Sequence, residues 1–194
     1  MPLRVVSDCI TVILSVFLVL GLTLVPATAA SYRDYADKLN ANPPKGAVYR
    51  PDLEDRLTTL ANAYRAKEGK DPLTADPMFL ELARAHAADM MLNGFMGHKA
   101  STGHQFSSRV TAYVGDVSRL PSIGENAARE TQKTEVNDTK LRSLFTQWVK
   151  SRSHRKNLVN RSFQFVSTGV IQRGNSIWAV QVFFATPREK GLFQ

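Results

Sequence analysis

The stretch 76–98 constrains the fold most, because it combines a full set of helix signals with a histidine just past the predicted end. Asp76 is a typical N-cap residue, and Pro77 suits the first helical position, where its missing N–H does no harm. Gly94 is a typical C-terminal stop. Apolar residues recur at helical spacing between these ends, so one face should be buried. The helix is therefore expected to hold His98 on a rigid support.

Three further helices and a pair of strands are expected around this helix. Apolar periodicity predicts the helices, over 53–67, 106–114 and 139–150. β-branched and aromatic residues dominate 163–172 and 176–186, and the Arg-Gly-Asn between them is a hairpin signal. Both faces of the second strand are largely apolar, so it should be central and covered on each side. Helices followed by a hairpin predict an α+β fold built in layers.

The first 29 residues are predicted to be a cleaved export signal. Arg4 precedes an apolar run over 10–25, which is short for a bilayer span, and Ala27-Thr28-Ala29 has the small residues of a cleavage site. An uncleaved anchor is the alternative. After cleavage we expect no transmembrane segment and a periplasmic or extracellular protein.

The remaining chain should form one domain, because its length suits a single buried core. Residues 30–52 are polar and contain prolines, which predicts an extended N-terminal arm or linker. We expect the domain to span 53–187, with a C-terminal tail over 188–194, and the protein to be a monomer.

The only cysteine is Cys9, inside the predicted signal, so the mature protein has neither disulfides nor cysteine-based catalytic or metal sites. The net charge is +8, and removal of Arg4 and Asp8 with the signal leaves it unchanged. An exported basic protein meets anionic envelope polymers or lipid head groups more readily than nucleic acid. Solubility alone is the simpler explanation of the charge.

Three ionisable residues at predicted element boundaries are candidates for chemistry: His98, Glu125 and His154. If they converge, they could bind a divalent cation or act as an acid–base set. Scattered surface positions are the simpler alternative. The chain has no local zinc motif, no nucleophile elbow and no glycine-rich phosphate loop. His86 lies on the buried helix face, where we expect a structural, hydrogen-bonded ring, with pairing to Asp89 as an option.

Four basic residues flank His154 in a predicted turn over 151–158 and at the end of the preceding helix: Lys150, Arg152, Arg155 and Lys156. They form either an ordinary solvated face or a ligand rim that attracts phosphate and carboxylate groups. As a rim, they would also disfavour the charged form of His154 and keep its imidazole neutral.

Short motifs follow one another in a specific order between 53 and 186. They are Leu82-Ala83, His86-Ala87-Ala88-Asp89-Met90, Gly94-Phe95-Met96-Gly97-His98, Gly124-Glu125-Asn126-Ala127-Ala128, Trp148, Ser153-His154-Arg155-Lys156-Asn157-Leu158, Gly169-Val170 and the run 178–184. In this order they resemble the CAP superfamily, the group of cysteine-rich secretory proteins, antigen five and plant pathogenesis-related proteins. The bacterial, SCP-like branch is the nearer resemblance.

The resemblance implies a three-layer α-β-α sandwich with a small antiparallel sheet between helices. It also implies a central cleft with two histidines and one or two acids, which in some members holds a divalent metal such as Zn²⁺, Ca²⁺ or Mg²⁺. His98, Glu125 and His154 match that set. The second acid would fall near Ser151, which is not acidic. That departure argues against a complete metal site.

Three hypotheses for function stay open. The first is a non-enzymatic binding module, with a His/Glu cleft and the lipid or envelope grooves that the resemblance implies. The second is a metal-assisted hydrolase or protease that uses His98 and His154 as ligands and Glu125 as base. The third is a structural envelope protein with a vestigial cleft. The missing second acid and the lack of an evident nucleophile favour the first.

Overall fold

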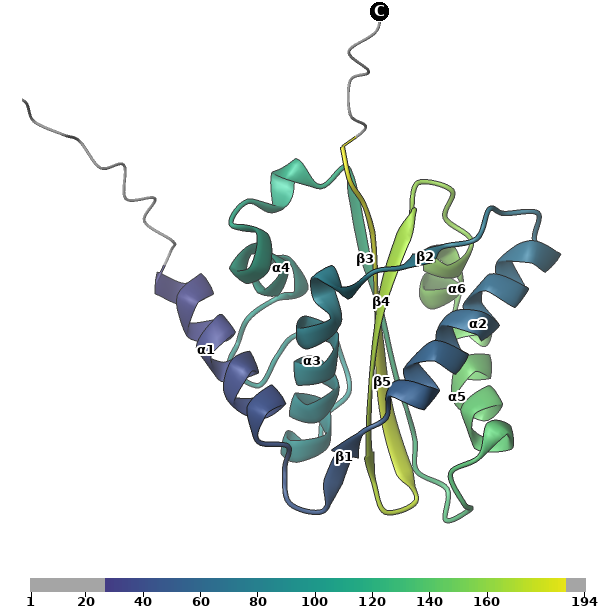
Figure 1. Cartoon of the computed structure of the whole chain (residues 1–194), viewed down its shortest axis with the longest axis horizontal. Coiled ribbons are helices and arrows are strands. Elements are labelled where there is room, and N and C mark those ends of the chain that lie inside the picture. The colour runs from purple at the N-terminus through teal and green to yellow at the C-terminus, as the bar shows by residue number, and fades with distance from the viewer. Residues whose placement is uncertain (1–26, 188–194) are drawn as a thin grey trace, which may run out of the picture.

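A computed structural model describes residues 27–187 as three layers, with a sheet between two layers of helices (Figure 1). One helical layer holds α1 (Ala27–Ala41), α3 (Leu80–Asn93) and α4 (Phe106–Val114). The other holds α2 (Pro51–Lys67), α5 (Asp138–Lys150) and α6 (Arg152–Leu158). The predicted α+β class and the α-β-α sandwich are thus confirmed.

The sheet has five strands, β1 (Ala47–Tyr49), β2 (Thr74–Ala75), β3 (Ser122–Glu130), β4 (Phe165–Arg173) and β5 (Ser176–Ala185). The order is β1-β4-β5-β3 with antiparallel pairing, and the short β2 joins β4 in parallel. The predicted hairpin is confirmed as β4 and β5, and Gly174 takes a φ of 57° in its turn. β5 is central, as its two apolar faces predict.

Two apolar clusters fill the spaces on either side of the sheet. Phe79, Met90 and Val182 belong to the cluster beneath α3, whereas Leu57 and Trp148 belong to the cluster beneath α2 and α5. All five are fully buried. The burial of both faces explains why β5 shows no polar alternation.

The helix predicted after Asp76 is confirmed, although its first turn is a 3₁₀ turn, Pro77–Phe79. The Asp76 side chain accepts a hydrogen bond from the Met78 N–H at 2.8 Å. Gly94 ends α3 with a φ of 68°, in the left-handed region that glycine favours. The loop that follows carries His98 toward the sheet.

The prediction of an extended arm over 30–52 is wrong. α1 packs on α3 and α4 with Tyr32 and Ala36 buried, and β1 pairs with β4. The Tyr35 hydroxyl donates to the buried Asp89 carboxylate at 2.7 Å. This segment is therefore part of the domain. Its few buried residues are spaced among many polar ones, so the apolar pattern did not indicate a helix.

The structure contains one strand and one helix, β3 and α6, that the sequence did not predict. β3 extends through Glu130, which is only 7% exposed. The predicted turn over 151–158 contains α6. β3 carries polar residues inside the sheet, and α6 is too short to show a helical repeat, so neither gave a clear pattern.

The predicted export signal, 1–29, and the tail over 188–194 fall almost entirely outside the described residues. Ala27–Ala29, the predicted cleavage site, begin α1. Within 27–187, none of the helices has the length and apolar character needed to cross a membrane.

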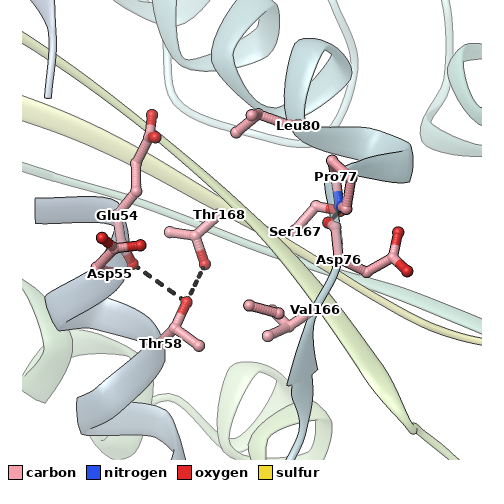
Figure 2. Close-up of a pocket in the computed structure, with 10 residues that line it drawn as sticks. Glu54, Asp55, Thr58, Asp76, Pro77, Leu80, Val166, Ser167 and Thr168 are labelled. Carbon is pink, nitrogen blue, oxygen red and sulfur yellow. Dashed lines mark hydrogen bonds between the residues drawn. The ribbon is translucent and has the colours of Figure 1, made fainter. Parts of the chain in front are cut away.

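The outer edge of β4 is partly open, and a cavity of about 190 Å³ lies there (Figure 2). β1 pairs with 171–173 of β4 and β2 with 165–166, which leaves the edge between them without a partner strand in the described chain. The Thr58 and Thr168 hydroxyls meet at 2.9 Å beside the cavity. This cavity is at the opposite sheet edge from β3, and neither His98 nor His154 lines it.

Candidate functional site

The structure brings His98, Glu125 and His154 together from three distant segments. His98 lies in the loop after α3, Glu125 on β3 and His154 on α6. The Nδ1 atom of His98 is 2.8 Å from Oε1 of Glu125. The rings of His98 and His154, which we call the histidine pair, have centroids 5.8 Å apart and meet edge to face at 68°. The expected convergence is therefore present in the fold.

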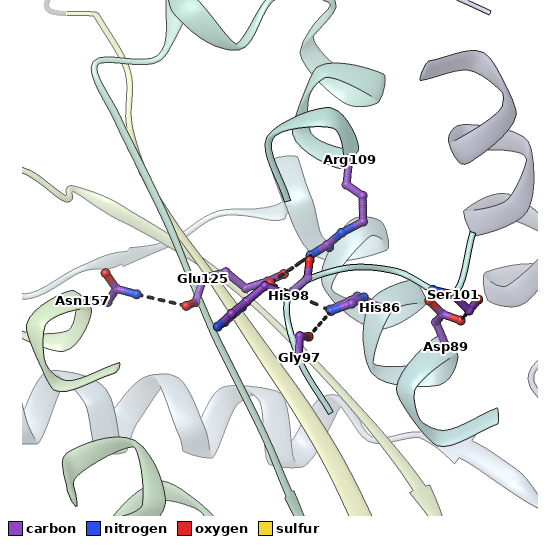
Figure 3. Close-up of polar contacts among 8 residues, drawn as sticks. All are labelled: His86, Asp89, Gly97, His98, Ser101, Arg109, Glu125 and Asn157. Atoms are coloured by element: carbon purple, nitrogen blue, oxygen red, sulfur yellow. Dashed lines mark hydrogen bonds and ion pairs between the residues drawn. The ribbon is translucent and has the colours of Figure 1, made fainter. Parts of the chain in front are cut away.

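Arg109, on α4, holds the carboxylate of Glu125 (Figure 3). Its Nη2 atom donates to Oε1 at 2.9 Å and to Oε2 at 2.8 Å. The same nitrogen donates to the main-chain oxygen of His98 at 2.9 Å. The Arg109 side chain is 0% exposed and the Glu125 side chain 1%. A buried ion pair thus anchors both the acid and the loop of one histidine.

Two asparagines fix α6, and with it His154, against β3. Asn157 donates from Nδ2 to the main-chain oxygen of Glu125 at 3.0 Å and to Oδ1 of Asn126 at 2.9 Å. Asn126 donates from Nδ2 to the main-chain oxygen of His154 at 3.2 Å. Because these amides connect the two elements directly, the spacing of the histidine pair is set by side-chain hydrogen bonds as well as by packing.

His86 stabilises the loop that carries His98 by a hydrogen bond to the main chain of that loop. Its ring is fully buried, and Nε2 lies 2.8 Å from the main-chain oxygen of Gly97 (Figure 3). Since a carbonyl oxygen only accepts, Nε2 carries the proton and donates. Burial lowers the pKa of His86, which keeps the ring neutral. The expected structural role is confirmed.

The optional pairing of His86 with Asp89 is not formed. The Asp89 carboxylate instead accepts from the Tyr35 hydroxyl at 2.7 Å and from the Ser101 N–H at 2.9 Å. Asp89 therefore ties α1 and the loop after His98 to α3.

The three ionisable groups of the site have clearly different affinities for protons. Burial would raise the pKa of Glu125, but the charge of Arg109 and the hydrogen bond from His98 lower it to about 2. The hydrogen bond to Glu125 raises the pKa of His98 against the effect of burial. Burial, followed by the charge of His98, lowers the pKa of His154. The carboxylate is ionised at neutral pH, and His98 is the more basic ring.

The expected ligand rim consists of exposed side chains at the end of α5 and along α6: Lys150, Arg152, Arg155 and Lys156. On α6, Leu158 is buried and His154 is half-buried. The lowered pKa of His154 was predicted, but its causes are burial and His98, not these four charges. Their attraction for anions stays a prediction.

A divalent cation does not fit a site that uses all three residues as ligands. Both oxygens of Glu125 already accept hydrogen bonds, and a cation beside them would meet the charge of Arg109. Across 27–187, no three His, Cys, Asp or Glu side chains are arranged to hold a metal ion. Ser151, near the expected second acid, lies with its hydroxyl 3.1 Å from that of Ser153. The histidine pair alone supplies fewer protein ligands than zinc sites normally use.

Arg109 is the site residue that sequence reasoning missed. It follows Phe106 by three positions and precedes Val110 directly, so it belongs to the apolar face of a predicted helix. Arginine is rarely fully buried unless it is paired. A basic residue on that face was therefore the available sign of a buried acid partner.

Comparison with known proteins agrees with this fold. The sequence model of the Cysteine-rich secretory protein family, CAP, matches residues 58–183. The chain belongs to this family. α1 and β1, which complete the domain here, precede the matched region.

A bacterial relative, the "Uncharacterized protein YkwD" of Bacillus subtilis (strain 168), is 32% identical over 129 residues. The match covers 66% of this chain and 46% of that protein, so it spans about half of the relative's length.

Two solved structures show the same fold. An outer surface protein from Borrelia burgdorferi matches with a TM-score of 0.61 and 17% identity, over 73% of this chain and 98% of its own. An extracellular protein containing a SCP domain from Bacillus anthracis str. Ames matches with a TM-score of 0.56 and 23% identity, over 70% of this chain and 41% of its own.

Proposed function

We propose that this chain is an exported, non-enzymatic binding module whose histidine pair holds an anionic oxygen group of a cell-envelope ligand. The ion pair of Arg109 with Glu125 is the observation that carries the proposal. It neutralises the only carboxylate within hydrogen-bonding distance of His98 among the described residues, so that the accessible groups are imidazoles. The His98 side chain is 49% exposed and can reach a ligand.

The same geometry disfavours the hydrolase hypothesis. A general base works best with a pKa near the operating pH, whereas the pKa of Glu125 is about 2 and its side chain is 1% exposed. Both of its oxygens are also occupied by donors. Glu125 is thus suited to orient His98 rather than to take a proton from water.

The electrostatics of α6 favour an anionic ligand. The exposed rim residues Arg152, Arg155 and Lys156 are on the same helix as His154, and the chain as a whole carries a net charge of +8. Clustered charge of one sign raises the local concentration of oppositely charged ligands and the rate of encounter. A phosphate or carboxylate group would be attracted here and then accept a hydrogen bond from Nε2 of protonated His98 and one from His154.

Export is supported by two observations. The sequence predicts an export signal over 1–29, and the matched structures are described as an outer surface protein and an extracellular protein. We therefore place the ligand in the periplasm or outside the cell.

Titration calorimetry with inorganic phosphate tests the proposal. The wild type should bind phosphate, and the double variant His98→Ala/His154→Ala should lose at least about tenfold in affinity. His104→Ala is the matched control, because that ring is 5.4 Å from the Tyr32 ring and outside the histidine pair. Equal affinity in the wild type and the double variant would refute the proposal.

A further inference from the structure

We infer that Arg109 determines the specificity of the histidine site: its guanidinium takes the place of a divalent cation beside Glu125 and makes the site select anions over metal ions. The anion half of this inference rests on the proposed function. The metal half rests on the geometry of Arg109 and Glu125 alone.

The guanidinium occupies the position between the two carboxylate oxygens where a metal ion would bind both of them. Nη2 of Arg109 is 2.9 Å from Oε1 and 2.8 Å from Oε2, between the two oxygens that a cation would need. Nδ1 of His98 takes a further position on Oε1 at 2.8 Å. A metal ion could bind both oxygens of Glu125 only by displacing these donors.

Displacement of the Arg109 guanidinium from Glu125 is unfavourable, because its charge would then be buried without a counter-ion. The residue is fully buried, and the rings of Tyr32 and Phe106 lie 6.0 and 5.5 Å from its guanidinium carbon. Nε and Nη1 have no hydrogen-bond partner within the described part of the chain. Glu125 is therefore the counter-ion that makes burial of this charge tolerable, and separating the two would leave both uncompensated.

Arg109 therefore changes the net charge beside the histidine pair. Without Arg109, His98 and His154 would lie beside a bare carboxylate, which attracts cations. With Arg109, the two charges cancel, and an incoming metal ion would approach a guanidinium that cannot move away. An anion meets no such opposition, since the carboxylate is neutralised. Arg109 on α4 thus determines whether the site prefers a negatively or a positively charged ligand.

The experiment compares zinc and inorganic phosphate as separate probes on the wild type, Arg109→Gln and Arg109→Lys, with folding checked by circular dichroism. Arg109→Gln should bind zinc about tenfold more tightly than the wild type and bind phosphate more weakly. Arg109→Lys retains the charge and should keep the wild-type preference. A folded Arg109→Gln whose zinc affinity equals that of the wild type would overturn the inference.

A second measurement decides the matter if Arg109→Gln does not fold. Zinc is titrated into the wild type and into His98→Ala/His154→Ala. Equal zinc affinity in the two supports the inference, because it shows that the histidine pair does not hold the metal. A clear loss in the double variant overturns it. Absence of phosphate binding to the wild type would instead reject the proposed function, and the zinc results would still stand.

Discussion

Arg109 and Glu125 form a buried ion pair in which one guanidinium nitrogen lies 2.9 and 2.8 Å from the two carboxylate oxygens. The pair joins α4 to β3, and through His98 it reaches the loop after α3. Because both side chains are almost completely buried, the pair is a fixed part of the core and not an adjustable surface contact. The charge and the hydrogen bonding around the histidine pair are therefore determined by the Arg109–Glu125 ion pair.

Glu125→Gln should destabilise the protein strongly. The substitution keeps the shape of the side chain but leaves Arg109 without its counter-ion, and breaking a buried pair in this way costs about 3–5 kcal/mol. Urea unfolding of the variant and the wild type measures the loss. Glu81→Gln is the control, because its ion pair with Arg33 is exposed and should cost no more than about 1 kcal/mol. Similar losses in both variants would contradict the account.

The stability of the wild type should fall as the pH is lowered from about 4 to 2. The pKa of Glu125 is depressed to about 2 in the folded protein, whereas a free glutamate has a pKa of about 4.3. A depressed carboxyl group stabilises the fold above its unfolded pKa and loses that contribution as the pH falls through its folded pKa. Glu125→Gln does not titrate, so its urea midpoint should change less over this window. Parallel pH profiles would show that Glu125 is not the group responsible.

Gly169→Ala should destabilise the contact between α3 and β4. A Cβ atom at Gly169 would lie 2.3 Å from the main-chain nitrogen of Arg84, and backbone cannot move aside as a flexible side chain can. Overpacking of this kind typically costs about 1–3 kcal/mol, or more. Gly103→Ala is the control for backbone strain without a steric clash, since Gly103 has a φ of 89° but open space around it. Thermal unfolding should show the larger loss for Gly169→Ala, and the reverse order would be inconsistent with this packing.

Charge reversal on α6 should weaken capture of anionic surfaces. Arg152→Glu/Arg155→Glu removes two exposed positive charges next to His154 and adds two negative ones. Binding to vesicles of anionic phospholipid, measured by sedimentation at several salt concentrations, should fall and lose its salt dependence. Arg119→Glu is the control, because Arg119 is in the 3₁₀ turn 117–119 and not on α6. Unchanged binding by the double variant would leave the four basic residues as an ordinary solvated face.

The sequence predicted the parts of the fold that have a strong local period. The helix ending at Gly94 and the hairpin at Gly174 were recognisable, because capping residues and apolar spacing agreed there. α1, β3 and α6 were not, since their buried faces are short or polar and are defined by contacts with distant elements. Tyr32, for example, is buried only because α3 and α4 cover it.

The candidate site shows the same limit. His98, Glu125 and His154 were identified, the resemblance to a known family giving them a common setting that spacing alone did not. Arg109 was missed, because its partner Glu125 is 16 positions away and no local pattern connects a helix residue to a strand that was itself not predicted. A basic residue on the apolar face of α4 indicates that an acid partner exists, but only the folded structure identifies that partner as Glu125.

Nuclear magnetic resonance of the imidazole nitrogens during a phosphate titration shows whether the histidine pair itself holds the anion. We expect the ring signals of His98 and His154 to shift together and to saturate at the same phosphate concentration, while those of buried His86 stay in place. Phosphate binding that leaves the signals of the histidine pair unchanged would contradict the proposed function.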